Sequence, residues 1–457
     1  MIPILSIDQL RQLDQKAHSQ GRLEELVNNA GRQVYVAALK ILKGTYGRRV
    51  FVIAGRGNNG KDAMVAAKLL RDRGAKVVEV EADKCDLVPR DFELVIDGAY
   101  GTGFHGTYSR PRLQGNPYVI SIDIPSGVNG DTGVACDGAI KADATVTFAS
   151  LKAGLLIGDG PNLAGHISVA DIGLEIDACN TWLLEESDCI GNINFGKRSD
   201  NKWSYPVAVL SARPGMEGAT HLASSSAMHA GAGMVRILCR SGTSERLPVS
   251  EAVIVEYPNE NYVDEVGVES QRCKAMVVGP GFGLSEEAKL QLRSIIATST
   301  CPLVIDADAI SAFSNAQDLR EVLKCQPRRE VVITPHDGEF ERLVGRKPLP
   351  DRISDVRELA QRLGCSVLLK GPASIVASSS GEVYVSNSGT KVLATAGSGD
   401  VLAGLIASLI ARGCNTFQAA AYGTFIHGKS ARQLGSYAIT ASALPSAIAK
   451  WFERGEH

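Results

Sequence analysis

A glycine-rich segment near the amino terminus carries the first residues whose types and spacing could do chemistry. Gly55-Arg56-Gly57-Asn58-Asn59-Gly60 follows an apolar run and precedes a helix-compatible run, which is the setting of a dinucleotide-binding Rossmann loop. With Lys61 and Asp62 the same segment nearly completes a phosphate-binding P-loop, but Asp62 stands where a hydroxyl must bind Mg²⁺. A dinucleotide loop and a plain strand-to-helix turn therefore both remain open.

Two aspartates follow later apolar segments that are predicted to be strands. Asp97 is followed by Gly98-Ala99-Tyr100-Gly101, and Asp123 by Ile124-Pro125-Ser126-Gly127. Because the carboxyl ends of parallel strands meet at one edge of a sheet, we expect Asn59, Asp97 and Asp123 to face a common crevice. Amide and carboxylate oxygens in such a crevice suit a hard cation. The alternative is that each aspartate only caps a turn.

A third segment combines an anion site with a candidate base. Thr395-Ala396-Gly397-Ser398-Gly399-Asp400 leads directly into the apolar run Val401–Ile410, and free N–H groups at such a helix start bind anions. Asp400 would repel a phosphate as a ligand, but it could take the proton of a hydroxyl that receives a phosphoryl group. An ordinary aspartate in a first helical turn is the alternative. Small and polar residues close four more apolar runs, at 279–283, 306–308, 334–339 and 368–371.

These residues require strands that end at one edge of a sheet. Residues 8–43 have helical periodicity with a break at 21–22, and 61–73 is helix-compatible. Five short strands are predicted in the first part: 50–54, 77–80, 93–96, 118–122 and 144–148. Eight are predicted in the second part: 207–210, 234–239, 252–256, 275–278, 302–305, 330–333, 366–369 and 374–377. This alternation predicts two α/β domains with parallel, doubly wound sheets. We place the domains at 1–195 and 196–457, within a polar stretch at 177–202.

Composition narrows the class of protein. The 457 residues fit two or three domains at the usual ~100–200 residues each. With 48 Lys and Arg against 50 Asp and Glu, the formal charge of −2 excludes a generally basic nucleic-acid binder. None of the ten cysteines forms a Cys-x-x-Cys unit, and the start of the chain has no signal-peptide pattern. The longest apolar stretch, Val401–Ala411, is shorter than the ~20 residues that span a bilayer. We expect a cytoplasmic protein without nucleic-acid or membrane partners.

The first group of motifs resembles the N-terminal domain of NAD(P)H-hydrate epimerases, which has a Rossmann-like fold and usually carries Asn-Asn-Gly-Gly-Asp-Gly. This chain departs from that pattern at Lys61 and Ala63. The resemblance implies K⁺ bound by Asn59, Asp97 and Ser126, and a proton-shuttling role for Asp123. It also implies that the hydrated nicotinamide nucleotide contacts Asn58, Asn59, Gly60, Lys61, Asp62, Gly101, Thr102, Gly103, Phe104, His105, Gly106, Thr107 and Asp123. The Lys61 ammonium could meet a substrate phosphate.

The second group resembles the ribokinase-like NAD(P)H-hydrate dehydratase domain, from about residue 200 to the end. The resemblance implies an adenine-nucleotide site made of Lys370, Gly371, Pro372, Ala373, Ser374 and Gly399. It implies contacts with the hydrated dinucleotide from Ala219, Gly281, Gly283, His336 and Asp400. The family's usual domain opening, His-Lys-Gly-x-Tyr-Gly, is replaced here by Asn201-Lys202-Trp203-Ser204-Tyr205-Pro206.

Together the resemblances imply a bifunctional repair enzyme that epimerises hydrated NADH and NADPH and dehydrates the S form. Asp400 and Asp123 are the expected catalytic residues. K⁺ is expected in the first domain, ADP or ATP with Mg²⁺ in the second, and a homo-oligomer overall. The alternatives are a ribokinase-class small-molecule kinase fused to a non-catalytic nucleotide-binding domain, a non-catalytic sensor or scaffold in the first domain, and a Rossmann dehydrogenase. The residues leave open whether ADP or ATP is the phosphoryl donor and which hydrate is preferred.

Overall fold

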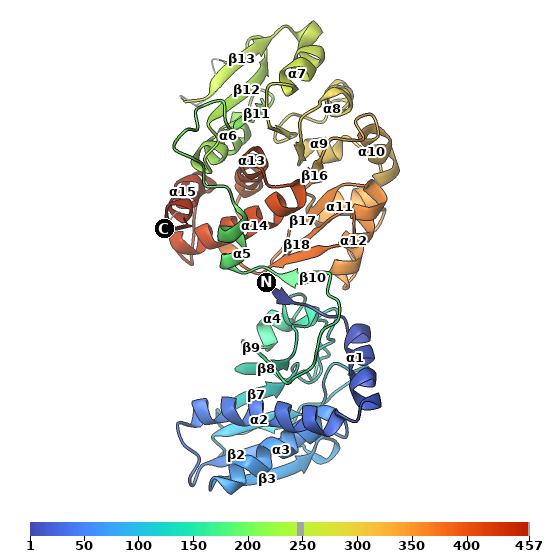
Figure 1. The fold of residues 1–457 in the computed structure, drawn as a ribbon, viewed down its shortest axis with the longest axis vertical. Coiled ribbons are helices and arrows are strands. Elements are labelled where there is room, and N and C mark those ends of the chain that lie inside the picture. The colour runs from blue at the N-terminus through green and yellow to red at the C-terminus, as the bar shows by residue number, and fades with distance from the viewer. Residues whose placement is uncertain (245–250, 456–457) are drawn as a thin grey trace. The chain divides into compact units, whose positions relative to one another are not determined.

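The computed structural model describes residues 1–244 and 251–455 and shows two compact units. One unit consists of Ile2–Thr181, and the other of Trp182–His457 together with Met1 (Figure 1). The division falls near the start of the polar stretch 177–202. Each unit is built on its own mainly parallel sheet, so the predicted α/β class is confirmed.

The sheet of the first unit is parallel throughout, in the order β3-β2-β5-β7-β8-β9. Its strands are Arg49–Ala54 (β2), Lys76–Glu81 (β3), Leu94–Gly98 (β5), Tyr118–Ile122 (β7), Ala144–Phe148 (β8) and His166–Ala170 (β9). The chain passes from β3 across β2 to β5, so the strand order reverses beside β2. A doubly wound sheet opens a ligand crevice at such a reversal, beyond the carboxyl ends of the strands.

Three helices frame this crevice: Ile7–Ser19 (α1), Leu23–Leu42 (α2) and Asn58–Asp72 (α3). Ser6 and Gln9 form a capping box that starts α1, and Gly21, at a φ of +73°, makes the predicted break before α2. The third helix begins three residues before its predicted start. Short elements complete the unit: Ile2–Pro3 (β1), Ala82–Lys84 (η1), Leu87–Val88 (β4), Arg112–Leu113 (β6), Ala153–Leu155 (η2) and Gly160–Leu163 (α4).

The larger sheet of the second unit runs in the order β19-β18-β17-β16-β15-β14-β11-β12-β13. Its strands are Pro206–Leu210 (β11), Met234–Arg240 (β12), Val253–Tyr257 (β13), Ala275–Val278 (β14), Leu303–Ile305 (β15), Val331–Ile333 (β16), Ser366–Leu369 (β17), Ser374–Ala377 (β18) and Val383–Ser386 (β19). All pairings from β13 to β17 are parallel, and β18 and β19 are antiparallel. Thr181–Leu183 (β10) lies at the division between the units. The eight strands predicted for this half of the chain are confirmed.

The helices of the second unit cover its sheet. They are Glu186–Asn192 (α5), Glu217–His229 (α6), Tyr262–Ser270 (α7), Glu286–Thr298 (α8), Asp308–Ser311 (α9), Ala316–Leu323 (α10), Asp337–Val344 (α11), Arg352–Leu363 (α12), Ser398–Ala411 (α13), Thr416–Leu434 (α14) and Leu444–Gly455 (α15), with short turns at Asn259–Asn261 (η4), Lys391–Leu393 (η5) and Ala441–Ala443 (η6).

The apolar helix α13 forms the centre of this core. Every residue from Val401 to Ala411 is buried. A Cβ at Gly404 would overlap the carbonyl of Ala223, so α13 and α6 touch along their backbones. The longest apolar stretch of the sequence is therefore a core helix. Across residues 1–244 and 251–455, none of the helices combines the length and apolar character needed to cross a membrane.

Candidate active sites

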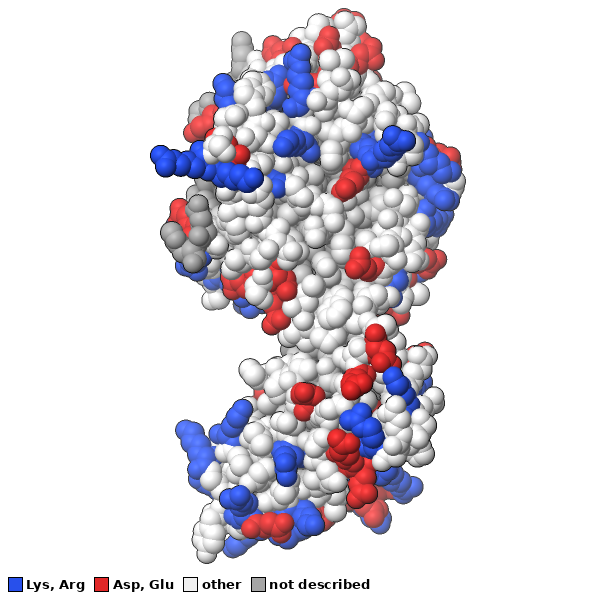
Figure 2. Space-filling view, viewed as in Figure 1, with Lys and Arg blue, Asp and Glu red and all other residues white. Residues whose placement is uncertain are grey.

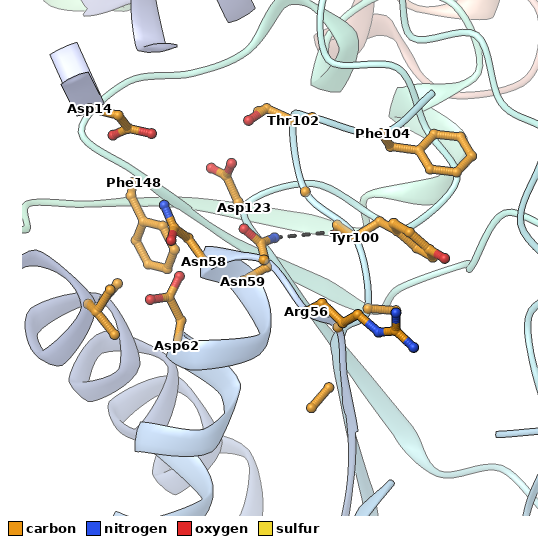
Figure 3. Close-up of a pocket in the computed structure, with 18 of the residues that line it drawn as sticks. Asp14, Arg56, Asn58, Asn59, Asp62, Tyr100, Thr102, Phe104, Asp123 and Phe148 are labelled. Atoms are coloured by element: carbon orange, nitrogen blue, oxygen red, sulfur yellow. Dashed lines mark hydrogen bonds between the residues drawn. The ribbon is translucent and has the colours of Figure 1, made fainter. Parts of the chain in front are cut away.

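A cavity of about 1010 Å³ lies beyond the carboxyl ends of the strands in the first unit (Figure 3). Its lining includes the following predicted site residues: Asn58, Asn59, Asp62, Gly101, Thr102, Gly103, Phe104 and Asp123. Two glycines of the predicted loop are required by close contacts, because a Cβ at Gly55 would overlap the Ala99 carbonyl and one at Gly60 would overlap the Gly55 carbonyl. The structure thus brings three separate motifs to one crevice.

Other predicted residues of this unit are placed differently. Among the residues described, Gly60, Lys61, His105, Gly106 and Thr107 do not belong to the cavity lining. Lys61 is exposed and lies in a separate shallow hollow beside His18 and Glu24, so its position does not support the expected contact with a substrate phosphate. The His105 ring lies 3.3 Å from an Arg11 guanidinium nitrogen.

Asn59 and Ser126 meet at the carbonyl of Tyr100, and Ser126 links this point to Asp97, which lies outside the cavity lining. Asp97 is fully buried, and its Oδ1 accepts a 2.6 Å hydrogen bond from Ser126 Oγ, while Oδ2 accepts one of 2.7 Å from Ser121 Oγ. Ser126 Oγ and Asn59 Nδ2 lie 3.2 and 3.4 Å from the Tyr100 oxygen. Burial raises the pKa of Asp97, and its neutral hydrogen-bond donors offset this only in part.

Sequence reasoning missed Lys152, which pairs with Asp123. Lys152 Nζ lies 2.5 Å from Asp123 Oδ1, and the lysine side chain is 2% exposed. The ammonium also donates to Thr147 Oγ1 at 2.8 Å and to the Phe148 carbonyl at 3.0 Å. Asp123 itself adopts a left-handed φ of +67°, a conformation that non-glycine residues adopt mainly where surrounding structure enforces it. The sequence feature that could have indicated this role is the position of Lys152 shortly after the apolar strand 144–148.

Asp14 and Asp62 add two further carboxylates to this cavity (Figure 3). Burial, followed by the charges of Asp123 and Asp14, raises the pKa of Asp62 to about 8. Burial and the charge of Asp123 also raise the pKa of Asp14, against the effect of Lys152. Asp14 lies within an amphipathic helix, where no sequence signal distinguishes it from a solvent-facing acid.

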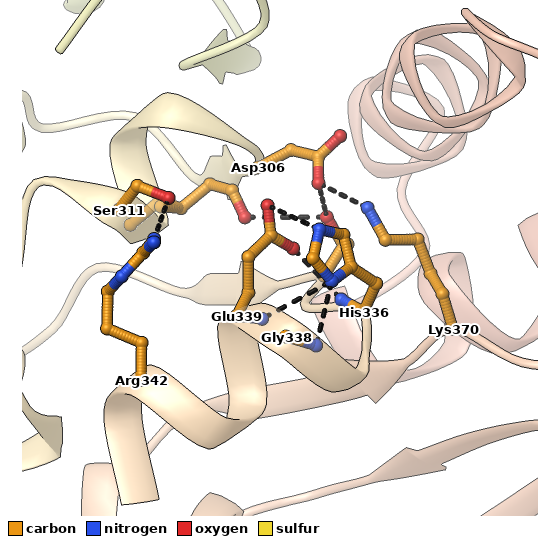
Figure 4. A network of polar contacts seen from close by, with 9 residues as sticks. Asp306, Ser311, His336, Gly338, Glu339, Arg342 and Lys370 are labelled. Atoms are coloured by element: carbon orange, nitrogen blue, oxygen red, sulfur yellow. Dashed lines mark hydrogen bonds and ion pairs between the residues drawn. The ribbon is translucent and has the colours of Figure 1, made fainter. Parts of the chain in front are cut away.

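The second unit contains a partly buried ion pair at the carboxyl ends of β15 and β17. Lys370 Nζ lies 2.7 Å from Asp306 Oδ1, and Thr334 Oγ1 donates to the same oxygen at 2.8 Å (Figure 4). Burial lowers the pKa of Lys370, but the carboxylates of Asp306 and Glu339 outweigh it and raise that pKa above its usual value. Lys370 was predicted as a site residue, whereas Asp306 and Thr334 were noted only as parts of strand ends.

His336 and Glu339 form a capping box at the start of α11 (Figure 4). His336 Nδ1 accepts from the backbone N–H of Gly338 at 2.9 Å, and Glu339 Oε2 accepts from the His336 N–H at 2.9 Å. The helix start thereby fixes the imidazole, whose Nε2 lies 3.6 Å from Glu339 Oε1. Burial raises the pKa of Glu339 in spite of the neighbouring Lys370.

Asp400 lies in the first turn of α13 and belongs to the same group of charges. Burial, followed by the charge of Asp306, raises its pKa to about 6, and Lys370 opposes this shift. Gly397, at a φ of +87°, turns the chain into the helix. A Cβ at Gly399 would lie 3.7 Å from Lys370 Nζ, so the loop passes directly beside the ion pair. The predicted base and the predicted nucleotide lysine are thus neighbours.

Two predicted glycines lie beside α6 in this unit. Gly281 has a φ of +65°, and a Cβ there would come within 3.2 Å of the Ala219 Cβ. The Gly283 N–H donates to Asp308 Oδ2 at 2.8 Å. The remaining predicted nucleotide residues, Gly371 to Ser374, form the turn between β17 and β18.

Both units are α/β folds on mainly parallel sheets, one with a cavity beside a reversal of strand order and the other with a glycine-rich helix start beside Asp400. Residues 207–454 match the NAD(P)H-hydrate dehydratase family, and residues 23–86 and 78–154 match the YjeF-related protein N-terminus.

Curated relatives extend over both units. The bifunctional NAD(P)H-hydrate repair enzyme Nnr of Moorella thermoacetica is 30% identical over 96% of this chain and 95% of its own length. The enzyme of the same name from Mycobacterium tuberculosis is 33% identical over 83% of this chain and 82% of its own. The chain belongs to the family of bifunctional NAD(P)H-hydrate repair enzymes.

Solved structures support the fold of the second unit. The Bacillus subtilis ADP/ATP-dependent NAD(P)H-hydrate dehydratase, co-crystallised with ATP/Mg²⁺, superposes with a TM-score of 0.52 at 22% identity, covering 61% of this chain and all of that one. A ribokinase-like superfamily protein from Enterococcus faecalis gives a TM-score of 0.52 at 21% identity, covering 62% of this chain and 98% of that one. These likenesses identify a ribokinase-like fold.

Proposed function

We propose that the chain repairs hydrated NADH and NADPH with two separate sites. The first unit interconverts the R and S hydrates, and the second dehydrates the S hydrate at the expense of ADP or ATP. The observation that carries the proposal is Asp400, a half-buried acid with a pKa near 6 at a helix start, beside the Lys370–Asp306 pair. Family membership supports the pairing of these two activities.

In the dehydratase site, Asp400 accepts the proton of the substrate's C6 hydroxyl as its oxygen attacks the terminal phosphorus of the nucleotide. The bond from that phosphorus to its bridging oxygen breaks, and the electron pair leaves with the shortened nucleotide. Phosphate then leaves C6 with the C–O electron pair, assisted by the ring nitrogen, and loss of a C5 proton restores the dihydronicotinamide. A poor leaving group is thereby converted into a good one.

Backbone N–H groups and the ammonium of Lys370 hold the nucleotide. The free N–H groups at the start of α13, next to Gly399, provide an anion site. Lys370 supplies an ammonium for the phosphates, and the turn Gly371–Ser374 lies beside it. Mg²⁺, bound with the nucleotide, would neutralise phosphate charge. Ala219, Gly281, Gly283 and His336 are proposed to contact the hydrated dinucleotide.

In the first unit, the group around Asp97 has the chemistry of a potassium site. Asp97 is a fully buried carboxylate whose hydrogen-bond partners are neutral, so its negative charge lacks a counterion among the described side chains. The Ser126 hydroxyl and the Tyr100 carbonyl supply further oxygens nearby, and the Asn59 amide lies beside them with its nitrogen directed to the Tyr100 carbonyl. One negative charge among neutral oxygens fits a single monovalent hard cation. K⁺ there would fix the loops that line the cavity.

The direct test is incubation of the purified chain with a mixture of R and S hydrates. With ADP or ATP, absorbance of dihydronicotinamide should recover to the full amount of hydrate, because the R form is converted before it is dehydrated. Without nucleotide, chromatography should show exchange between epimers and no dihydronicotinamide. Accumulation of a stable phosphorylated product would instead indicate a small-molecule kinase.

A further inference from the structure

Three carboxylates and one ammonium line the cavity of the first unit. Asp14 comes from α1, Asp62 from α3, Asp123 from the segment after β7, and Lys152 from the segment after β8. Figure 3 shows Asp14, Asp62 and Asp123 pointing into the same space, with Asn58 between Asp62 and Asp123 in this view. At full ionisation the group would carry two uncompensated negative charges, so its members must differ in protonation.

The ammonium of Lys152 is committed to Asp123. Nζ lies 2.5 Å from Asp123 Oδ1, and Thr147 Oγ1 donates to that oxygen at 3.1 Å. The remaining donors of Lys152 are used by oxygens of its own loop, including the Ser150 carbonyl at 3.2 Å. Among the described ion pairs, Asp123 is the only one of the three carboxylates with a cationic partner. The structure therefore fixes the position of the Asp123 carboxylate.

The walls around Asp62 supply negative charge and apolar surface. Asp14 and Asp123 face it across the cavity, while Lys61, its neighbour on α3, points to solvent. The stretch of α2 that lines the cavity contributes the apolar side chains Leu23, Leu26, Val27 and Ala30.

The other charged groups of the lining already form ion pairs. Arg11 of α1 forms an ion pair with Asp8 at 3.2 Å. Arg56 pairs with Asp83 at 2.6 Å, and Glu81 ends the neighbouring strand β3. Consistent with these surroundings, Asp62 has a pKa of about 8 and carries its proton at neutral pH.

Resting on the epimerase function proposed above, we propose that Asp62 is the general acid and Asp123 the general base of epimerisation, with Lys152 as the residue that positions Asp123. Asp62 and Asp123 come from different elements that bound one cavity. A flat nicotinamide ring between them meets a proton donor on one face and a proton acceptor on the other, as inversion at one carbon requires.

The chemistry balances with these two groups. The C6–O bond breaks with its electron pair on oxygen, which takes the Asp62 proton and leaves as water, while the ring-nitrogen lone pair forms a C=N bond. A water molecule then adds to C6 from the opposite face and returns the electron pair to nitrogen. Asp123 takes the proton of that water. The reverse reaction uses the same groups in exchanged roles, and solvent resets their protons.

The test follows epimerisation of the R hydrate of NADH by chromatography, without nucleotide, across a pH series. The wild-type rate should fall as the pH rises through about 8, because Asp62 loses its proton there. Asp62→Asn should reduce the rate at pH 7 by about 10²–10⁴, the usual contribution of general acid–base catalysis. It should also remove the fall in rate near pH 8, the basic limb of the pH profile. Asp14→Asn should move the limb to lower pH, since one neighbouring negative charge is removed.

Lys152→Met should lower kcat for epimerisation with little change in KM, because Asp123 loses the ammonium that holds its carboxylate in place. Thr147→Val, which removes a single donor, should do the same to a smaller extent if Lys152→Met fails to fold. Dehydration of the pure S hydrate with ADP, a reaction of the other unit, checks each preparation. Near wild-type epimerisation by Asp62→Asn, or an unmoved basic limb in Asp14→Asn, overturns the proposal. A wild-type chain that does not epimerise at all overturns the proposed function first.

Discussion

The ammonium of Lys370 lies 2.7 Å from the buried carboxylate of Asp306 (Figure 4). The loop that carries Asp400 into α13 passes beside this pair. Thr334 donates to the same carboxylate oxygen, so Asp306 keeps a partner when Lys370 turns toward a phosphate. The pair keeps the Lys370 ammonium next to the start of α13, and the buried carboxylate of Asp306 retains a counterion. The same carboxylate raises the pKa of Asp400. One residue thus influences both nucleotide binding and the proposed base.

Replacing Lys370 by Met should weaken binding of adenine nucleotide by about 10–100-fold, the loss of one charged hydrogen bond. It should also destabilise the second unit, because Asp306 loses its counterion. Arg346→Met is the matched control, since it breaks the bidentate pair with Asp355 in the same unit. Calorimetric titration with ADP should show weakened binding in Lys370→Met alone. Equal weakening in both variants would assign the effect to folding.

The dehydration rate should rise with pH through about 6, because Asp400 must be ionised to act as a base and its pKa lies near that value. Asp306→Asn removes a negative neighbour, which lowers the pKa of Asp400 and should shift this limb to lower pH. The midpoint of the pH profile at saturating nucleotide measures the effect. A limb that moves upward in Asp306→Asn would contradict the assigned electrostatics.

Epimerisation should depend on potassium. In buffers in which tetramethylammonium replaces K⁺, the first unit should epimerise more slowly, while dehydration of pure S hydrate stays unchanged. Asp97→Asn removes the one charge of the proposed site and should abolish the response to K⁺. Rates in K⁺ and tetramethylammonium that agree for the wild-type chain would exclude a site at Asn59, Asp97 and Ser126.

Asp62→Asn should stabilise the first unit at neutral pH while it removes epimerisation. The pKa of Asp62 is raised on folding, so its contribution to stability is fully present below its unfolded value near 4 and is lost as pH rises toward 8. An amide avoids this loss, and we expect a gain of about 1–3 kcal/mol at pH 7. Thermal unfolding should show that the gain vanishes near pH 4. A gain that is the same at both pH values would contradict the linkage.

Much of the fold could be predicted because the buried strands are short apolar runs that end in glycine and polar residues. The segments 118–122, 144–148 and 275–278 match β7, β8 and β14 residue for residue. Six strands in the described part of the chain were not predicted: β9, β19 and the shorter β1, β4, β6 and β10. The first of these is largely exposed along its length, so its sequence lacks the apolar run that marks a buried strand.

The candidate sites were predicted where a motif closes a strand, and missed where the partner came from elsewhere. Lys152 reaches Asp123 from a different strand end, and Asp14 reaches the cavity from α1. Whether the Lys61 side chain faces the cavity or the solvent depends on the residue at which α3 begins. Because the helix starts at Asn58, Asp62 faces the cavity and Lys61 the solvent, and no apolar residue in that first turn could have indicated this.

The measurement that tests the central claim most directly is the pair of activities of Asp400→Asn. Its amide cannot accept the proton of the C6 hydroxyl, so dehydration of the S hydrate with ADP or ATP should fall by about 10²–10⁴. Interconversion of the R and S hydrates, assigned to the other unit, should keep its wild-type rate. Dehydration close to wild type, or loss of both activities in a folded variant, would contradict two independent sites with Asp400 as the base of one.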